Sequence, residues 1–256
     1  MWSNITERLR QGETLYGTMV RYIREPSITG ILARAGFDFV LIDMEHSVYS
    51  FETVADHIRT ARDSRIAPIV RPPAREKYFL SRLLDAGAAG LMVPMTERRE
   101  HAEVIRDACR YRPVGKRGVA NSLAQTDFLT LPATELVEQA NRNNLIITQV
   151  ESEEGVRNID EILQVEGIDA VIIGPNDLSD SMGIVGQTGH PQVQEAIGRV
   201  VEACRRHGKF SGIHTGNLEQ LRYWRERGMQ LLAYQTDVAV LYSTFNRYIS
   251  EMKAEA

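Results

Sequence analysis

Eight short apolar runs, separated by helix-like segments, constrain the fold more than any other feature of the sequence. They are residues 14–20, 37–43, 67–70, 90–94, 145–150, 169–174, 210–213 and 231–234. The runs are apolar without alternation, which is typical of strands buried on both faces in a parallel sheet covered by helices. Several intervening segments end in a glycine just before the next run, as helices commonly do (Gly36, Gly87, Gly208, Gly228).

Eight strand-then-helix units in 256 residues predict a (β/α)8 TIM barrel, with residues 1–256 as a single domain. A doubly wound parallel sheet is the alternative. It is disfavoured because no G-x-G-x-x-G motif follows the first strand and no linker divides the chain. The longest connection, residues 111–144, contains a turn rich in glycine and proline and then a helix from about Ala133.

Composition excludes several classes of partner. The formal net charge is −4, so no positive excess draws the chain to nucleic acid or to an anionic membrane. No apolar run has the length of a signal peptide or a transmembrane helix. Cys109 and Cys204 lie in helical patterns with apolar neighbours, which indicates reduced core thiols. We therefore expect a soluble, cytoplasmic protein without nucleic-acid or membrane partners.

Ionisable or amide side chains follow six of the predicted strands. In strand order they are Asp43, Glu45 and His46; Arg71; Gln149 and Glu151; Asn176 and Asp177; His214; Gln235 and Asp237. Each has an ordinary structural explanation alone, since Asp177 could cap a helix, Glu151 could begin one, and Arg71 could pair with a structural carboxylate. Catalytic groups of TIM barrels lie at the carboxyl ends of strands, so their joint position predicts an active site there.

The residue types in this set indicate a metal-assisted reaction of a 2-oxo acid. Glu151 and Asp177 would repel each other unless a proton or cation lay between them, and carboxylate oxygens suit Mg²⁺ or Mn²⁺. Arg71 can grip a ligand carboxylate in a bidentate fork. His46, backed by Asp43, suits proton transfer near neutral pH. A 2-oxo acid would chelate the ion, which then stabilises the enolate.

Two other mechanisms lack the residues they need. Schiff-base catalysis requires a lysine at a strand end, and none of the four lysines lies there (Lys77, Lys116, Lys209, Lys253). A phosphate site is poorly supported, because "HTGN" and "QTDVA" follow strands seven and eight in place of glycine-rich loops.

Several segments resemble the HpcH/HpaI aldolases, which are class II pyruvate-dependent aldolases. They include "AGFDFVLIDMEHS", "QVESEEGVRNIDEIL" and "VEGIDAVIIGPNDLSDSMG", and the resemblance runs from about Leu15 to the last helix. It implies a barrel of the phosphoenolpyruvate/pyruvate type that cleaves a 4-hydroxy-2-oxo acid to pyruvate and an aldehyde. It also implies a divalent metal (Mg²⁺ or Mn²⁺, with Co²⁺ or Zn²⁺ as alternatives) and a homo-hexamer, a trimer of dimers that exchange the last helix.

The resemblance also implies roles for individual residues. Glu151 and Asp177 match the metal ligands, and Arg71 matches the arginine that binds pyruvate. His46 matches the catalytic histidine, with Asp43 as its orienting partner. Substrate-binding positions match Gln149, Gly174 and Asn176, of which the last two form a turn whose amides face the pyruvate carboxylate.

The chain departs from the family pattern around this set. Met44 replaces a glycine, His214 replaces an aliphatic residue, and Gln235 lies where the family has a Val-Gly-x-Asp ending. We expect His214 and Gln235 to contact the substrate and favour a polar aldehyde, unless His214 turns away toward a neighbour such as Asp237. The functional alternatives are an enzyme of the oxaloacetate decarboxylase or phosphonopyruvate hydrolase type, or a barrel that binds 2-oxo acids without turnover.

Overall fold

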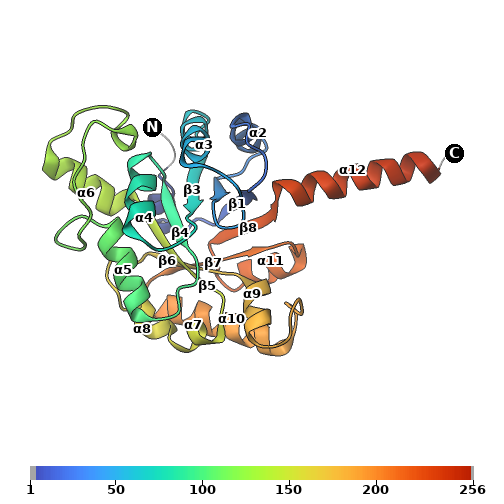
Figure 1. The fold of residues 1–256 in the computed structure, drawn as a ribbon. Coiled ribbons are helices and arrows are strands. Elements are labelled where there is room, and N and C mark those ends of the chain that lie inside the picture. Colours follow the sequence, from blue (N-terminus) through green and yellow to red (C-terminus); the bar gives the residue numbers. More distant parts are fainter. Residues whose placement is uncertain (1–3, 255–256) are drawn as a thin grey trace.

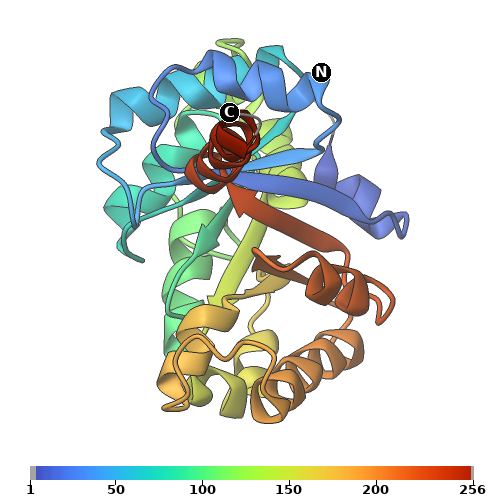
Figure 2. The ribbon, with the colours of Figure 1, turned by 90° about the vertical axis from the view of Figure 1, so that its right-hand side faces the viewer.

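The eight predicted strands close into one parallel barrel (Figures 1 and 2). The computed structural model describes residues 4–254, so residues 1–3 and 255–256 of the predicted domain lie outside the described residues. The strands are β1 (Leu15–Val20), β2 (Phe39–Asp43), β3 (Ala67–Arg71), β4 (Gly90–Val93), β5 (Leu145–Val150), β6 (Ala170–Ile173), β7 (Phe210–Thr215) and β8 (Leu231–Thr236). Each pairs with the next in sequence and β8 pairs with β1, which confirms the TIM barrel and excludes the doubly wound sheet.

Helices follow the strands and cover the outside of the barrel. They are α1 (Ile5–Arg10), α2 (Ser27–Arg34), α3 (Phe51–Asp63), α4 (Lys77–Asp85), α5 (Arg99–Cys109), η1 (Ala124–Thr126), α6 (Ala133–Asn143), α7 (Glu153–Arg157), α8 (Ile159–Leu163), α9 (Pro175–Ser181), α10 (Pro191–Arg206), α11 (Leu218–Arg225) and α12 (Asp237–Ala254). The helix predicted from Ala133 is α6. The four glycines expected to end helices all have positive φ, between 63° and 95°.

The strands are apolar throughout because both of their faces are buried. On β2, Phe39 and Leu41 point into the barrel, whereas Val40 and Ile42 pack outward in the same cluster as Ile58 of α3. Successive strand residues point to opposite faces, so this division follows from the pleat. Gly17 lies opposite Phe39, and a β-carbon there would approach the Phe39 ring to 2.3 Å, so glycine makes room for the ring in the barrel interior.

The mouth of the barrel is the end at which the carboxyl ends of the eight strands meet. The inward alternation carries polar residues to this end: Asp43 continues the series Phe39, Leu41, and Arg71 continues Ala67, Ile69. The uppermost inward layer is therefore polar, while the layers beneath it are apolar. That is the arrangement in which TIM barrels place their chemistry.

The last helix, α12, projects away from the barrel (Figure 1) and is seen nearly end-on in Figure 2. Its first residue, Asp237, is buried and accepts hydrogen bonds from the backbone N–H groups of residues 21–23, which anchors the helix at the mouth. No helix within residues 4–254 is long and apolar enough to cross a membrane.

Candidate active site

Asp43 and Arg71 form a buried ion pair at the centre of the mouth. They are register partners on β2 and β3, and the guanidinium donates from Nε to Oδ1 at 2.8 Å and from Nη2 to Oδ2 at 2.7 Å. Burial alone would raise the pKa of Asp43, but the hydrogen bonds and charge of Arg71 outweigh it and hold that pKa below its usual value. The pair uses the Nε–Nη2 edge of the guanidinium. On the Nη1–Nη2 edge, Nη2 donates only weakly to Sδ of Met19 at 3.9 Å and Nη1 lies beside Glu45, so a ligand carboxylate could replace both contacts there.

His46 lies differently from the sequence prediction. Asp43 does not reach its imidazole and instead accepts the backbone N–H groups of Glu45, at 3.0 Å, and of His46, at 3.4 Å. The His46 side chain is 58% exposed, with Nε2 3.8 Å from Oε2 of Glu45. The predicted Asp43–imidazole contact is therefore absent, because the strand register gives the Asp43 carboxylate to Arg71.

Glu45 is a site residue that the sequence analysis did not assign a role. Its Oε2 lies 3.0 Å from Nη1 of Arg71, as an ion pair without hydrogen-bond geometry, and this buried oxygen has no hydrogen-bond partner. Burial raises the pKa of Glu45, against the attraction of Arg71 and His46. Its place in the cluster of ionisable residues after β2 was the only sequence signal for it.

Met44, the residue between these two acids, does not line the mouth. Its side chain is buried and joins the outer cluster that contains Val54 and Ile58 of α3. The departure from the family pattern at this position therefore changes the hydrophobic packing between the barrel and α3, and does not change the residues that line the mouth.

Glu151 is the most strongly perturbed carboxyl group of the site. It follows β5, is buried, and accepts the backbone N–H of Met95 at 2.9 Å on Oε1 and the side-chain amide of Gln149 on Oε2. Burial raises its pKa to about 7, and the charges of Asp177 and Glu45 add to the rise, whereas the Met95 N–H and Arg71 oppose it. A buried acid beside two others favours protonation or a cation.

Asp177 lies in the first turn of α9, and Gly174 occupies the N-cap position of that helix. The ordinary explanation of Asp177 as a helix cap is therefore wrong. Asp177 and Asn176 are both exposed, and the charge of Asp177 acts on both Glu151 and Glu45. Glu151 does not begin a helix, because α7 starts at Glu153 and Ser152 is its N-cap.

His214 and Gln235 lie at the ends of β7 and β8, and they contact each other through the backbone of Gln235. Nε2 of His214 lies 3.0 Å from the Gln235 carbonyl oxygen, and the Gln235 side-chain amide donates to the carbonyl of Gly216 at 3.3 Å. Asp237 is engaged by backbone amides and not by His214, so the alternative pairing is wrong. Burial lowers the pKa of His214.

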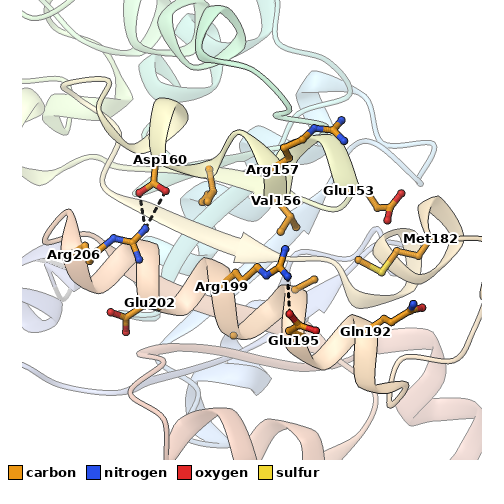
Figure 3. A pocket seen from close by; sticks show the side chains of 13 residues that line it. Glu153, Val156, Arg157, Asp160, Met182, Gln192, Glu195, Arg199, Glu202 and Arg206 are labelled. Atoms are coloured by element: carbon orange, nitrogen blue, oxygen red, sulfur yellow. Dashed lines mark hydrogen bonds and ion pairs between the residues drawn. The ribbon is translucent and has the colours of Figure 1, made fainter.

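A groove of about 910 Å³ lies away from the mouth, between α7, α8 and α10 (Figure 3). Its charged lining is largely paired internally: Arg206 contacts Asp160 at 2.7 Å, and Arg199 contacts Glu195 at 2.6 Å. None of the predicted site residues lines this groove. In this molecule the candidate active site is therefore identified by the ionisable groups at the strand ends and not by the volume of a cavity.

Comparison with known proteins agrees with this geometry. The HpcH/HpaI aldolase/citrate lyase family model matches residues 22–243. The hydroxypyruvate/pyruvate aldolase of Roseobacter denitrificans is 36% identical, with 92% of this chain and 91% of the relative covered. The 5-keto-4-deoxy-D-glucarate aldolase of Enterobacter sp. strain 638 is 35% identical, with 90% of each covered. The crystal structure of an HpcH/HpaI aldolase from Desulfitobacterium hafniense superposes with a TM-score of 0.94 at 35% identity, covering 97% of this chain and 96% of that one.

These relatives confirm the resemblance found in the sequence and the enzyme class that it implied, an aldolase among the carbon–carbon lyases. They do not favour the decarboxylase, hydrolase or non-catalytic alternatives. The match extends over most of the chain and includes every strand end that carries a site residue. The chain therefore belongs to the HpcH/HpaI aldolase/citrate lyase family.

Proposed function

We propose that this enzyme cleaves a 4-hydroxy-2-oxo acid to pyruvate and an aldehyde. In this reaction the C4 hydroxyl loses its proton, the C3–C4 bond breaks, and its electrons pass to the pyruvate enolate, which takes up a proton at C3. The proposal rests on one observation: a guanidinium and buried carboxyl groups lie together at the mouth. Arg71 has an edge that Asp43 does not use, and the charge of buried Glu151 acts on its guanidinium.

A divalent metal ion fits the acidic side of the site. Glu151 is held protonated up to about pH 7 by burial and by its acidic neighbours, and a cation would relieve the same repulsion. Within residues 4–254 no group of three His, Cys, Asp or Glu side chains is arranged to hold a metal ion, so Glu151 and Asp177 would leave several coordination positions for water and substrate oxygens. When bound, the ion would supply Lewis-acid stabilisation of negative charge on the 2-oxo group.

The carboxylate of the 2-oxo acid would bind the Nη1–Nη2 edge of Arg71. Glu45 competes for Nη1, so a ligand carboxylate would replace a contact that lacks hydrogen-bond geometry with two that have it. Gln149 adds no donor for this carboxylate, because its Nε2 donates to Glu151; its Oε1, buried without a partner, would instead accept a hydrogen bond from a substrate hydroxyl. In the turn after β6, the backbone N–H of Gly174 donates to the carbonyl of Val150 at 3.3 Å, so the backbone N–H of Asn176 would be the one that faces the same carboxylate.

His46 would transfer the proton that the pyruvate enolate takes up at C3. Its imidazole is exposed at the mouth and lies beside Glu45, which can stabilise the imidazolium that forms on proton uptake. The role of Asp43 is then indirect: it fixes the backbone of residues 45 and 46 and aligns Arg71.

The assembly state belongs to this proposal as well. Exposed apolar side chains recur along α12 every three to four residues, including Leu241, Tyr242, Phe245, Ile249 and Met252. Such a stripe on a projecting helix is unfavourable in water, and a second copy of the chain would bury it, as the predicted helix exchange within a homo-hexamer requires.

The buried free thiols Cys109 and Cys204 support the proposed cytoplasmic location.

The test is release of pyruvate and aldehyde from a panel of 4-hydroxy-2-oxo acids, after chelation and after return of Mg²⁺, Mn²⁺ or Co²⁺. We expect equal amounts of both products, activity only with metal, and loss of activity in Glu151→Gln and Asp177→Asn. His46→Ala should slow the exchange of pyruvate methyl protons with solvent by roughly 10²–10⁴-fold. Full activity of a verified metal-free enzyme, or CO₂ release without an aldehyde, would contradict the proposal.

A further inference from the structure

His214 occupies the mouth of the barrel but has no part in the mechanism proposed above. It continues the inward series Phe210, Gly212 on β7, and its register partner on β8 is the interior residue Ala233. The charges of Arg71, Asp43 and Arg21, from β3, β2 and the loop after β1, all act on its imidazole. The ring therefore faces the site where the reacting carbons must lie.

The hydrogen bond to Gln235 fixes which nitrogen of His214 carries the proton. A backbone carbonyl oxygen can only accept, so Nε2, at 3.0 Å from it, must be the N–H donor. Burial lowers the pKa of His214, and the cations Arg71 and Arg21 add to the fall against the opposing effects of the Gln235 carbonyl and Asp43, so the net shift favours the neutral ring. A neutral ring protonated on Nε2 has a bare Nδ1, which is a hydrogen-bond acceptor.

The backbone around Gln235 holds that tautomer in place. Gln235 has a φ of 62°, in the left-handed region, where the register between β8 and β1 shifts after Ala233. This irregularity turns the Gln235 carbonyl toward His214, and the Thr18 hydroxyl donates to the same oxygen at 3.4 Å. The acceptor partner of His214 is thus fixed by a backbone conformation that residues other than glycine seldom adopt.

Nδ1 of His214 is left without a partner. Within residues 4–254 no group hydrogen-bonds to it, and it is not among the buried polar atoms that lack a partner, so it is open to the mouth. Metal ligation does not explain the open Nδ1. If His214 joined Glu151 and Asp177 as a third ligand, the three side chains would form a metal-binding group, and no such group occurs among those residues. A role as a base is disfavoured, because proton uptake would place an imidazolium beside Arg71 and Arg21.

We propose that Nδ1 of His214 accepts a hydrogen bond from a hydroxyl group on the aldehyde half of the substrate, and so selects hydroxylated aldehydes over alkyl and carboxylated ones. The inference rests on the proposed aldolase function. An alkyl aldehyde has no donor for Nδ1 and leaves this acceptor unpaired. A carboxylate oxygen is itself an acceptor, so its lone pair repels that of Nδ1. Both kinds of aldehyde are therefore disfavoured relative to one that carries a hydroxyl donor.

The experiment measures aldol addition of pyruvate, with Mn²⁺, to three small aldehydes: glycolaldehyde, propanal and glyoxylate. For the wild type we expect kcat/KM for glycolaldehyde to exceed that for propanal by about tenfold, the effect typical of one hydrogen bond. His214→Leu should bring this ratio close to one and narrow the difference between glycolaldehyde and glyoxylate, because the acceptor that favours the first and repels the second is gone. His214→Gln, which keeps an acceptor oxygen, should retain part of the preference.

His207→Leu is the matched control, because His207 lies at the end of α10 and pairs with Asp160 outside the mouth. Exchange of pyruvate methyl protons, which needs no aldehyde, separates the two levels of the proposal. Absence of exchange in the wild type overturns the aldolase function and this inference with it. Normal exchange with the same aldehyde ratio in wild type and His214→Leu overturns the inference alone, as does a wild-type preference for propanal.

Discussion

At the scale of single residues, Arg71 combines a structural contact with a proposed binding contact. Its Nε and Nη2 hold buried Asp43, and the remaining edge would hold the substrate carboxylate. Losing either partner of such a buried pair leaves an uncompensated charge, at a cost of roughly 3–5 kcal/mol. Lysine keeps the charge but offers one ammonium in place of a planar fork, so it can serve only one of the two contacts well.

Arg71→Lys should therefore raise KM and lower kcat together, with kcat/KM reduced by roughly 10- to 100-fold, since a hydrogen bond to a charged group contributes about 1.5–3 kcal/mol. Steady-state kinetics on the 4-hydroxy-2-oxo acid would measure this. Arg199→Lys on α10 is the control, because it changes an exposed arginine that pairs with Glu195. A variant whose KM stays at the wild-type value would remove Arg71 from carboxylate binding.

Glu151 sets the expected pH dependence of metal binding. Its pKa is raised from 4.5 to about 7, primarily by burial, and only the deprotonated carboxylate can bind an ion. A raised pKa stabilises the metal-free fold below pH 4.5, and that contribution is lost as the pH rises through 7. Metal affinity follows the opposite course, because the proton that competes with the ion is released over the same range.

We therefore expect the affinity for Mn²⁺ to rise by up to about tenfold per pH unit below pH 7 and to level off above it. Calorimetric titrations between pH 5.5 and 8 would measure both the affinity and the protons released. Glu151→Gln should bind weakly and lose this dependence. An affinity that is flat between pH 5.5 and 7 would show that Glu151 is ionised before the metal arrives.

At the scale of helices and strands, burial explains what the sequence could predict. All eight strands were identified because both of their faces are apolar, but β7 and β8 run on to Thr215 and Thr236, beyond the predicted ends at residues 213 and 234. Polar residues such as His214 interrupt the apolar pattern although their backbone still pairs with the neighbouring strand. The helix α12 likewise begins at Asp237, directly after β8, where the sequence offers no turn.

The same limit applies to the site. The strand ends indicated which side chains share the mouth, because position along a parallel barrel decides that. They did not indicate which side chains pair, because pairing depends on register. Asp43 and Arg71 are register partners on the adjacent strands β2 and β3. The Asp43 carboxylate therefore binds Arg71 and does not contact the His46 imidazole. The role of the Gln235 carbonyl depends on a left-handed backbone that the residue type does not suggest.

The turn between β6 and α9 gives a prediction at this scale. A β-carbon on Gly174 would lie 2.8 Å from Oε2 of Glu151 and 3.1 Å from Nε2 of Gln149, so Gly174→Ala should displace the proposed metal ligand. We expect metal affinity to fall by roughly 10- to 100-fold, as when a supporting contact of a ligand is lost. Gly189→Ala is the control, because a β-carbon there meets no atom within 4 Å. Equal affinities in the two variants would contradict the close approach.

At the scale of the whole molecule, α12 is the element that the barrel does not stabilise. Only its first residue is buried, while Tyr242 and Phe245 are 71% and 63% exposed. Helical stability in proteins derives mainly from packing of one apolar face, and this stripe stays exposed among residues 4–254. A second copy of the same chain supplies such a surface without any other component.

Replacing Tyr242 and Phe245 together with serine should therefore shift the protein from an oligomer toward monomer, because two large aromatic side chains of the stripe no longer bury apolar surface at roughly 25 cal/mol per Å². Sedimentation velocity over a range of protein concentrations would measure the shift. Phe128→Ser is the control, since Phe128 is 72% exposed but lies in the long connection before α6. The barrel itself should stay folded by circular dichroism, because neither residue contributes to its core. Wild-type protein that sediments as a monomer at every concentration would contradict the proposal, as would a double variant that assembles like the wild type.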